Sequence, residues 1–205
     1  MNETDYSLSP GRLMDLVKQT LLVMLGRRPF SGTYAFDAAA VWQAIWASVI
    51  FTLVVSLYPG LKSGVGILMA NLILQLLAVV LMVLLFMMIL RTAGLEGRIF
   101  AFVVPFLWVE NVQHLFGGIV QNLVIITGDG TLLILITPLI FWSVYWLWRI
   151  GRDQLGRGGW FATGLLFLSF QSNIEYQFIF MQHAWCNNEI FLERGTDLDP
   201  ICGVS

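Results

Sequence analysis

Long apolar stretches alternate with short polar ones along this chain. A helix needs about 20 mainly apolar residues to cross the hydrocarbon layer of a bilayer. Four stretches come close to this length while carrying almost no charge, and we predict a membrane-spanning helix in each. They are residues 38–58, 65–90, 99–123 and 131–148.

A fifth stretch, residues 159–181, has an apolar first half and a polar second half. Gln171, Asn173 and Glu175 follow the apolar run 160–170. We predict a fifth span here, and the alternative is a re-entrant segment whose polar groups are satisfied by neighbouring helices. The predicted fold class is therefore all-α, a polytopic transmembrane helical bundle of about five spans.

The segment before the first span predicts an amphipathic helix over residues 10–26. Ser9 followed by Pro10 is typical of an N-cap and a first helical position. Apolar side chains recur at helical spacing, and charged ones take the other side. This pattern fits a helix that lies in the membrane interface and equally a surface helix that packs on the bundle. The apolar positions are Leu13, Leu16, Val17, Leu21 and Met24.

The distribution of Lys and Arg predicts the orientation, because short loops rich in these residues stay in the cytoplasm. Under the five-span prediction nine of them share one side, and only Lys62 and Arg194 fall on the other. We therefore expect a cytoplasmic segment 1–37, a transmembrane domain 38–181 and an extracytoplasmic tail 182–205. The nine are Arg12, Lys18, Arg27, Arg28, Arg91, Arg98, Arg149, Arg152 and Arg157.

Composition agrees with a membrane protein and offers no enzyme signature. The chain is 58% hydrophobic and 12% charged, whereas soluble domains carry roughly 25% charged residues. It has no His-Glu-x-x-His run, no Gly-x-Ser-x-Gly elbow and no phosphate-binding Gly-x-x-x-x-Gly-Lys motif. We expect no catalytic residues, no cofactor and no nucleic-acid partner, and the lipid bilayer is the expected surrounding.

The third predicted span gathers polar residues, which are costly in a membrane and usually serve a purpose there. Glu110 and His114 stand four residues apart and so share a helix face, which Gln121 continues. Asn111 and Asn122 flank this face. Of these residues, Glu110, Asn111, His114 and Gln121 form the predicted intramembrane polar cluster.

Two other predicted spans extend the cluster. Gln75 and Glu175 reach depths similar to that of His114, at roughly 1.5 Å per residue from the outer ends of their helices. Gly117 and Gly118 are small enough to let a neighbouring helix approach closely. If these faces meet, a polar pocket lies in the outer half of the bundle.

Three interpretations of this cluster follow from its chemistry. In the first, Glu110 is protonated or paired with His114, and the amides hold helices together. In the second, the two residues exchange a proton along a pathway for protons or small solutes. A metal site is the third, and it is disfavoured because two ligands are too few.

The predicted tail carries both cysteines, Cys186 and Cys202. On an oxidising side of the membrane they can form a disulfide, and two free thiols are the alternative. With His183 they also make a partial metal set, a weak signal because no tight motif surrounds it.

The order of these features resembles the bacterial branch of the Yip (Ypt-interacting protein) domain family, over residues 10–181. The resemblance lies in the turn from Gly94 to Arg98, the polar residues after Pro105 and the basic loop from Arg149 to Arg157. It implies a five-span bundle with a cytoplasmic N-terminus in the bacterial inner membrane. Eukaryotic members act in vesicle traffic with small GTPases, and the bacterial members have no assigned activity.

Two functional classes remain at this point. We favour a non-enzymatic scaffold or membrane-organising protein, which holds membrane-protein partners or a second copy of itself. The alternative is a transporter or channel subunit that uses the site around Glu110 and His114. Visible inverted repeats and paired broken helices, which mark many transporters, are missing.

Overall fold

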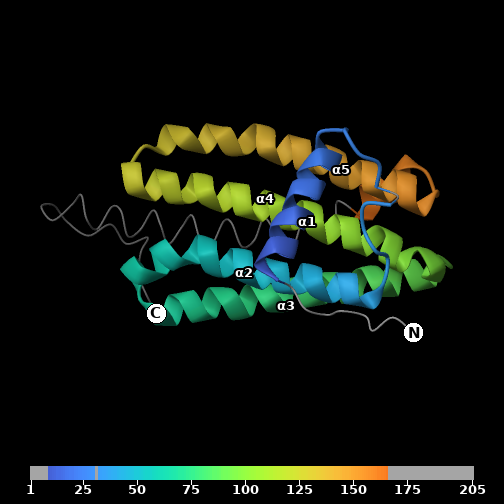
Figure 1. Ribbon diagram of the computed structural model, residues 1–205, viewed down its shortest axis with the longest axis horizontal. Coiled ribbons are helices and arrows are strands. Elements are labelled where there is room, and N and C mark those ends of the chain that lie inside the picture. Colours follow the sequence, from blue (N-terminus) through green and yellow to red (C-terminus); the bar gives the residue numbers. More distant parts are fainter. Residues whose placement is uncertain (1–8, 31, 166–205) are drawn as a thin grey trace, which may run out of the picture. The chain divides into compact units, whose positions relative to one another are not determined.

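The computed structural model describes residues 9–30 and 32–165, apart from the side chains of residues 63 and 67. These residues all lie in one compact unit, Met1–Leu166. Every regular element in the described ranges is helical (Figure 1). The elements are α1 (Pro10–Met24), α2 (Ala38–Ser63), α3 (Val65–Thr92), η1 (Glu96–Arg98), α4 (Ile99–Thr127), η2 (Gly130–Leu135) and α5 (Ile136–Leu155).

Four segments are long and apolar enough to cross a membrane, as the sequence predicted. All four end later than the predicted runs, because the helices continue through the polar residues that follow. Of the predicted fifth span, residues 159–165 are helical and the remainder lies outside the described residues, so the fifth crossing stays a prediction. The four segments are Ala38–Lys62, Leu68–Thr92, Glu96–Thr127 and Gly130–Leu155.

Helix α1 begins where the sequence predicted and ends two residues earlier. Pro10 occupies the first turn, and the Ser9 side chain accepts a backbone hydrogen bond of 3.3 Å. At the other end, the Arg27 N–H donates to the carbonyl of Leu22 at 2.9 Å, and Gly26 has a φ of 70°. This left-handed turn ends the helix. It requires a glycine, because a residue with a side chain rarely adopts that conformation.

Helix α4 is the centre of the packing. About 61% of its apolar stretch is buried, against 17% in the spans that contain α3 and α5, and residues 102–109 are buried without interruption. It contacts α1, α2, α3 and α5. The rings of Phe86 and Phe106 meet edge to face, with centroids 4.8 Å apart, and join α3 to α4. Many apolar side chains of α3 and α5 are exposed on the outer faces of these helices.

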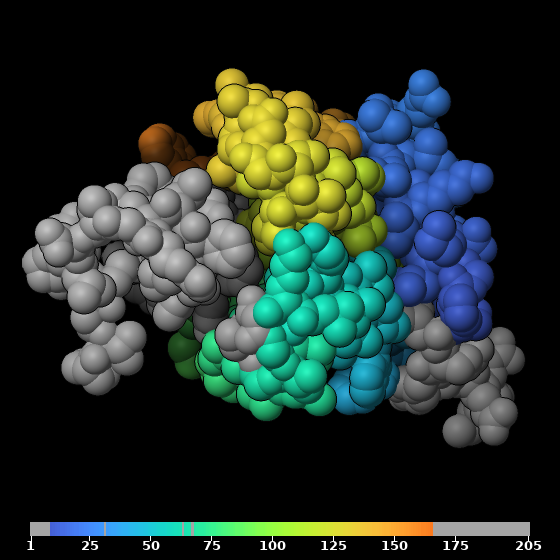
Figure 2. Space-filling model, turned by 90° about the vertical axis from the view of Figure 1, so that its left-hand side faces the viewer, coloured from blue at the N-terminus to red at the C-terminus, as the bar shows by residue number. Residues whose placement is uncertain are grey.

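Helix α1 lies on one flank of the bundle, across α4 (Figures 1 and 2). Its outer residues Asp15 and Lys18 are exposed. The Tyr34 hydroxyl donates a buried hydrogen bond of 3.0 Å to Thr20 Oγ1. Burial raises the pKa of Tyr34 to about 12, although this hydrogen bond acts in the opposite direction. The buried face of α1 consists of Val17, Thr20, Val23 and Met24.

Two arginines join the α3–α4 turn to the end of α5. Arg98 Nη1 donates to the carbonyl of Leu155 at 2.9 Å, and Arg157 Nη2 donates to the carbonyl of Ala93 at 2.8 Å. Each arginine thus caps the helix that ends in the other turn, where a cation also complements the helix dipole. The two basic turns lie at one end of the bundle, here called the basic end. The side of a membrane that it faces stays a prediction.

Candidate functional site

Helices α2 and α4 run parallel and are joined by two asparagines. Asn111 Nδ2 donates to the carbonyl of Ala44 at 2.8 Å, and Asn122 Nδ2 donates to the carbonyl of Val55 at 2.9 Å. Both pairs are 67 residues apart in sequence, so the two helices keep one parallel register along this length. Each bond reaches a backbone carbonyl, which requires closely packed helices.

Between the asparagines, His114 faces Thr52. Thr52 Oγ1 donates to the carbonyl of Ser48 at 2.8 Å, and His114 Nε2 lies 3.2 Å from the same Oγ1. Since the threonine proton is committed to Ser48, the oxygen accepts a hydrogen bond from the histidine. This network assigns the proton of a neutral ring to Nε2.

Gly118 brings the two backbones together. A Cβ atom at this position would overlap the side chain of Val55. At Gly117 a Cβ atom would meet nothing within 4 Å. The close approach that the sequence predicted for the two glycines is therefore made by Gly118.

These contacts define one stripe on each helix, here called the α2–α4 seam. The α4 positions are spaced by three, four and four residues, which keeps them on one helix face. The α2 positions are spaced by four, four and three. The seam consists of Ala44, Ser48, Thr52 and Val55 on α2 and Asn111, His114, Gly118 and Asn122 on α4.

The predicted cluster and the seam overlap only in part. Asn111 and His114 belong to both, and His114 meets Thr52 across the seam. Glu110 is half-buried and takes part in an interaction of its own, so its predicted pairing with His114 stays a prediction. Gln75 and Gln121 are also half-buried and make none of the seam hydrogen bonds. Glu175, Cys186 and Cys202 lie outside the described residues, as does His183.

Sequence reasoning missed the α2 side of the seam. Ser48 and Thr52 are each 3% exposed, and Ala44 is fully buried. Small residues at intervals of four in an apolar helix are typical of a helix contact in membranes. This spacing was the signal that could have located the seam.

One polar atom of the seam has no described partner. Asn122 Oδ1 is buried and accepts no hydrogen bond from the described residues. Within residues 9–30 and 32–165, no three acidic, histidine or cysteine side chains lie close enough together to hold a metal ion.

Comparisons with known proteins add one short similarity. The chain is 43% identical to the Dye-decolorizing peroxidase msp1 of Mycetinis scorodonius over 42 residues, which make up 20% of this chain and 8% of the peroxidase. No family model and no solved structure matches the chain. A stretch of this length does not carry the activity of the peroxidase to this protein.

Proposed function

We propose that this chain is an integral membrane protein with a structural role, a scaffold that organises membrane-protein partners or copies of itself without catalysing a reaction. The observation that carries the proposal is the use of α4's polar groups. Asn111, His114 and Asn122 all bond to α2, and Gly118 closes the space beside them. Polar side chains that hydrogen-bond to a neighbouring helix stabilise the contact between the two helices.

The orientation belongs to the same proposal. The basic end, with Arg98 and Arg157, faces the cytoplasm, and so does the segment that carries α1. In a bacterium this membrane is the inner membrane. The long helices after an amphipathic α1 support the resemblance to the bacterial Yip domain family, and we propose that relationship as well.

A subunit of a transporter or channel is the second candidate. The buried Oδ1 of Asn122 lacks a described partner, and the half-buried His114 lies about two helical turns earlier on the same helix. Polar and ionisable residues inside a membrane-spanning helix mark many proton and solute pathways.

Flux through reconstituted liposomes separates the two candidates. Wild-type protein and the variants Glu110→Gln and His114→Gln are compared by proton flux under an imposed potential and by uptake of small solutes. Gln113→Ala, which changes a half-buried amide of α4 outside both the predicted cluster and the seam, is the matched control. The structural role predicts the same background leak for all four proteins. Flux that wild type carries and the His114 variant loses would overturn it.

A further inference from the structure

One face of α5 changes from aromatic to cationic along its length. Phe141, Tyr145, Arg149 and Arg152 follow at intervals of four, four and three residues and so share a helix face. Phe141 is 71% exposed and Tyr145 50%. An apolar surface that turns cationic within a few helical turns matches the order of acyl chain and headgroup in an anionic phospholipid.

The two guanidinium groups on this face are held over indole rings. Arg149 Cζ lies 4.8 Å from the ring centroid of Trp146, and Arg152 Cζ lies 4.9 Å from that of Trp148. Asp153 receives Nε of both arginines, at 3.4 and 3.0 Å. Both contacts use Nε, so the Nη atoms, which form the far edge of each guanidinium, take no part in them. Those edges have the geometry that binds a phosphate with two hydrogen bonds.

The segment between α1 and α2 brings further cations to the same place. Trp142 Nε1 donates to the carbonyl of Met24 at 3.2 Å. The ring of Phe30 meets that of Trp146 edge to face, with centroids 5.8 Å apart. Both ends of residues 25–30 are therefore fixed on two successive turns of α5.

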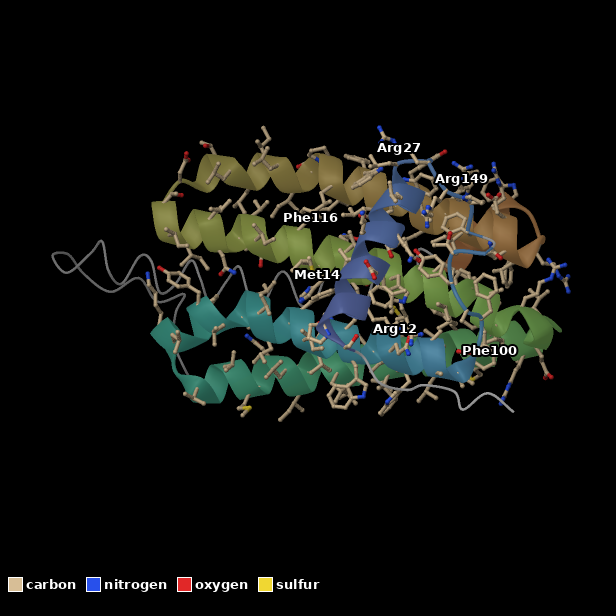
Figure 3. All side chains as sticks on the ribbon, in the orientation of Figure 1. Arg12, Met14, Arg27, Phe100, Phe116 and Arg149 are labelled. Carbon is tan, nitrogen blue, oxygen red and sulfur yellow. The ribbon has the colours of Figure 1, made fainter. Side chains whose placement is uncertain are left out.

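Arg27 and Arg28 lie within this fixed segment and are exposed. Figure 3 shows Arg27 and Arg149 at the same corner of the bundle. At this corner the anchored segment and the last turns of α5 contribute four arginines and one carboxylate, Asp153. The excess positive charge is large enough to attract an anion even after Asp153 has neutralised part of it.

We propose that this arginine corner, made of Arg27, Arg28, Arg149 and Arg152, binds the phosphate headgroup of an anionic phospholipid. The acyl chains lie along Phe141 and Tyr145. The inference rests on the proposed membrane placement and deepens it, because it turns a general attraction to anionic lipid into a site with defined residues. The indole rings keep the guanidiniums at headgroup depth, where tryptophan prefers to lie.

The test measures lipid binding to the full chain in a neutral detergent. Thermal unfolding and native mass spectrometry follow titrations with phosphatidylglycerol, phosphatidylcholine and inorganic phosphate. We expect phosphatidylglycerol to bind and to raise the unfolding temperature, and the other two to have no effect at equal concentration. Arg149→Gln should weaken phosphatidylglycerol binding about fivefold. The double variant Arg27→Gln/Arg28→Gln should weaken it about 25-fold, because it removes two arginines.

Lys62→Gln is the matched control, because Lys62 Nζ also lies over an aromatic ring, 5.1 Å from the centroid of Tyr58. Lys62 belongs to the last turn of α2, at the end of the bundle opposite to the basic end. It should bind phosphatidylglycerol as wild type does. Equal binding of phosphatidylglycerol and phosphatidylcholine, equal losses in the Lys62 and Arg149 variants, or saturation by inorganic phosphate would each overturn the proposal.

A measurement on the wild type protects the test from variants that do not fold. Raising the salt concentration must weaken phosphatidylglycerol binding, since the attraction is electrostatic, and binding that is independent of salt contradicts the site. The result is separate from the flux experiment, because the flux assay reports on the seam and the lipid titration on the corner. If the protein carries solute flux and still binds phosphatidylglycerol in preference to phosphatidylcholine, the structural role is wrong and the lipid site stands.

Discussion

The backbone of Gly118 in α4 lies directly against the side chain of Val55 in α2, with no room for a methyl group between them. Gly118→Ala should therefore destabilise the bundle by about 1–3 kcal/mol, since a tightly packed contact must open to admit the new carbon. Thermal unfolding in detergent measures the effect.

The neighbouring glycine supplies the control for this prediction. At Gly117 an added Cβ atom meets nothing within 4 Å, so Gly117→Ala should unfold at or slightly above the wild-type temperature, because alanine favours the helix. Equal destabilisation by both variants would show that helix geometry, and not the seam, is responsible.

Asn111→Ala should also destabilise the protein, by about 1 kcal/mol, because it removes the buried hydrogen bond to the Ala44 carbonyl. Chemical unfolding in mixed micelles measures the change. Gln121→Ala removes an amide from the same helix at a half-buried position that makes no seam contact, and its effect should be smaller. The reverse order would place the important polar contact of α4 on the face predicted from the sequence.

Arg98→Gln should loosen the last turn of α5 by about 1 kcal/mol, because the Leu155 carbonyl loses its cationic cap. Hydrogen exchange of the amides near residue 155 should become faster. Arg157→Gln should have the corresponding effect at the end of α3, whose neighbouring Ala93 carbonyl it caps. Arg91→Gln changes an exposed arginine of the same end and should leave both turns unaltered.

Tyr34 should make the fold sensitive to strongly alkaline solution. Its folded-state pKa is about 12, above the ordinary value of 10.0. The unfolded chain therefore loses this proton first, so the stabilisation is complete below pH 10 and falls as pH rises toward 12. Tyr34→Phe should lose less stability over this interval in denaturant titrations. Parallel curves for the two proteins would contradict the burial of this hydroxyl.

Reporter fusions test the topology. A reporter in the turn at residues 93–98 should be cytoplasmic, and one at residues 128–130 should be extracytoplasmic. A reporter after Ser205 should also be extracytoplasmic, because five crossings put the two termini on opposite sides. Cytoplasmic activity after Ser205 would remove the fifth crossing, and the predicted disulfide between Cys186 and Cys202 with it.

The span-length pattern and the start of α1 were predictable because each depends on neighbours in sequence. Apolar length alone located the four spans, and Ser9 with Pro10 located the first turn of α1. Which face of a membrane helix meets another is harder to predict, because an apolar surface suits lipid and protein equally well. The contacts of α3 show this difficulty, since almost every one of its positions is apolar.

The candidate site was predicted in part for the same reason. The sequence showed that α4 contains polar residues. Which of them face another helix depends on α2, whose contacting residue Ala44 lies 67 positions before Asn111 in the sequence. The sequence predicted a site around Glu110 and His114 because ionisable side chains are rare in membrane-spanning helices. The amides of Asn111 and Asn122 bond to backbone carbonyls of α2, which requires close backbones, and of the two ionisable groups His114 meets a side chain of α2.

The parallel pairing of α2 with α4 has a consequence for how the chain is made. Two parallel helices must be separated by a returning helix, so α2 leaves the ribosome and enters the membrane while its main partner is still unsynthesised. During that interval the Thr52 hydroxyl can bond to the Ser48 carbonyl of its own helix, as it does in the folded protein. Until α4 is synthesised, α2 can pack only against α3, so a fault in the seam should show as incomplete assembly of the bundle after α4 is made.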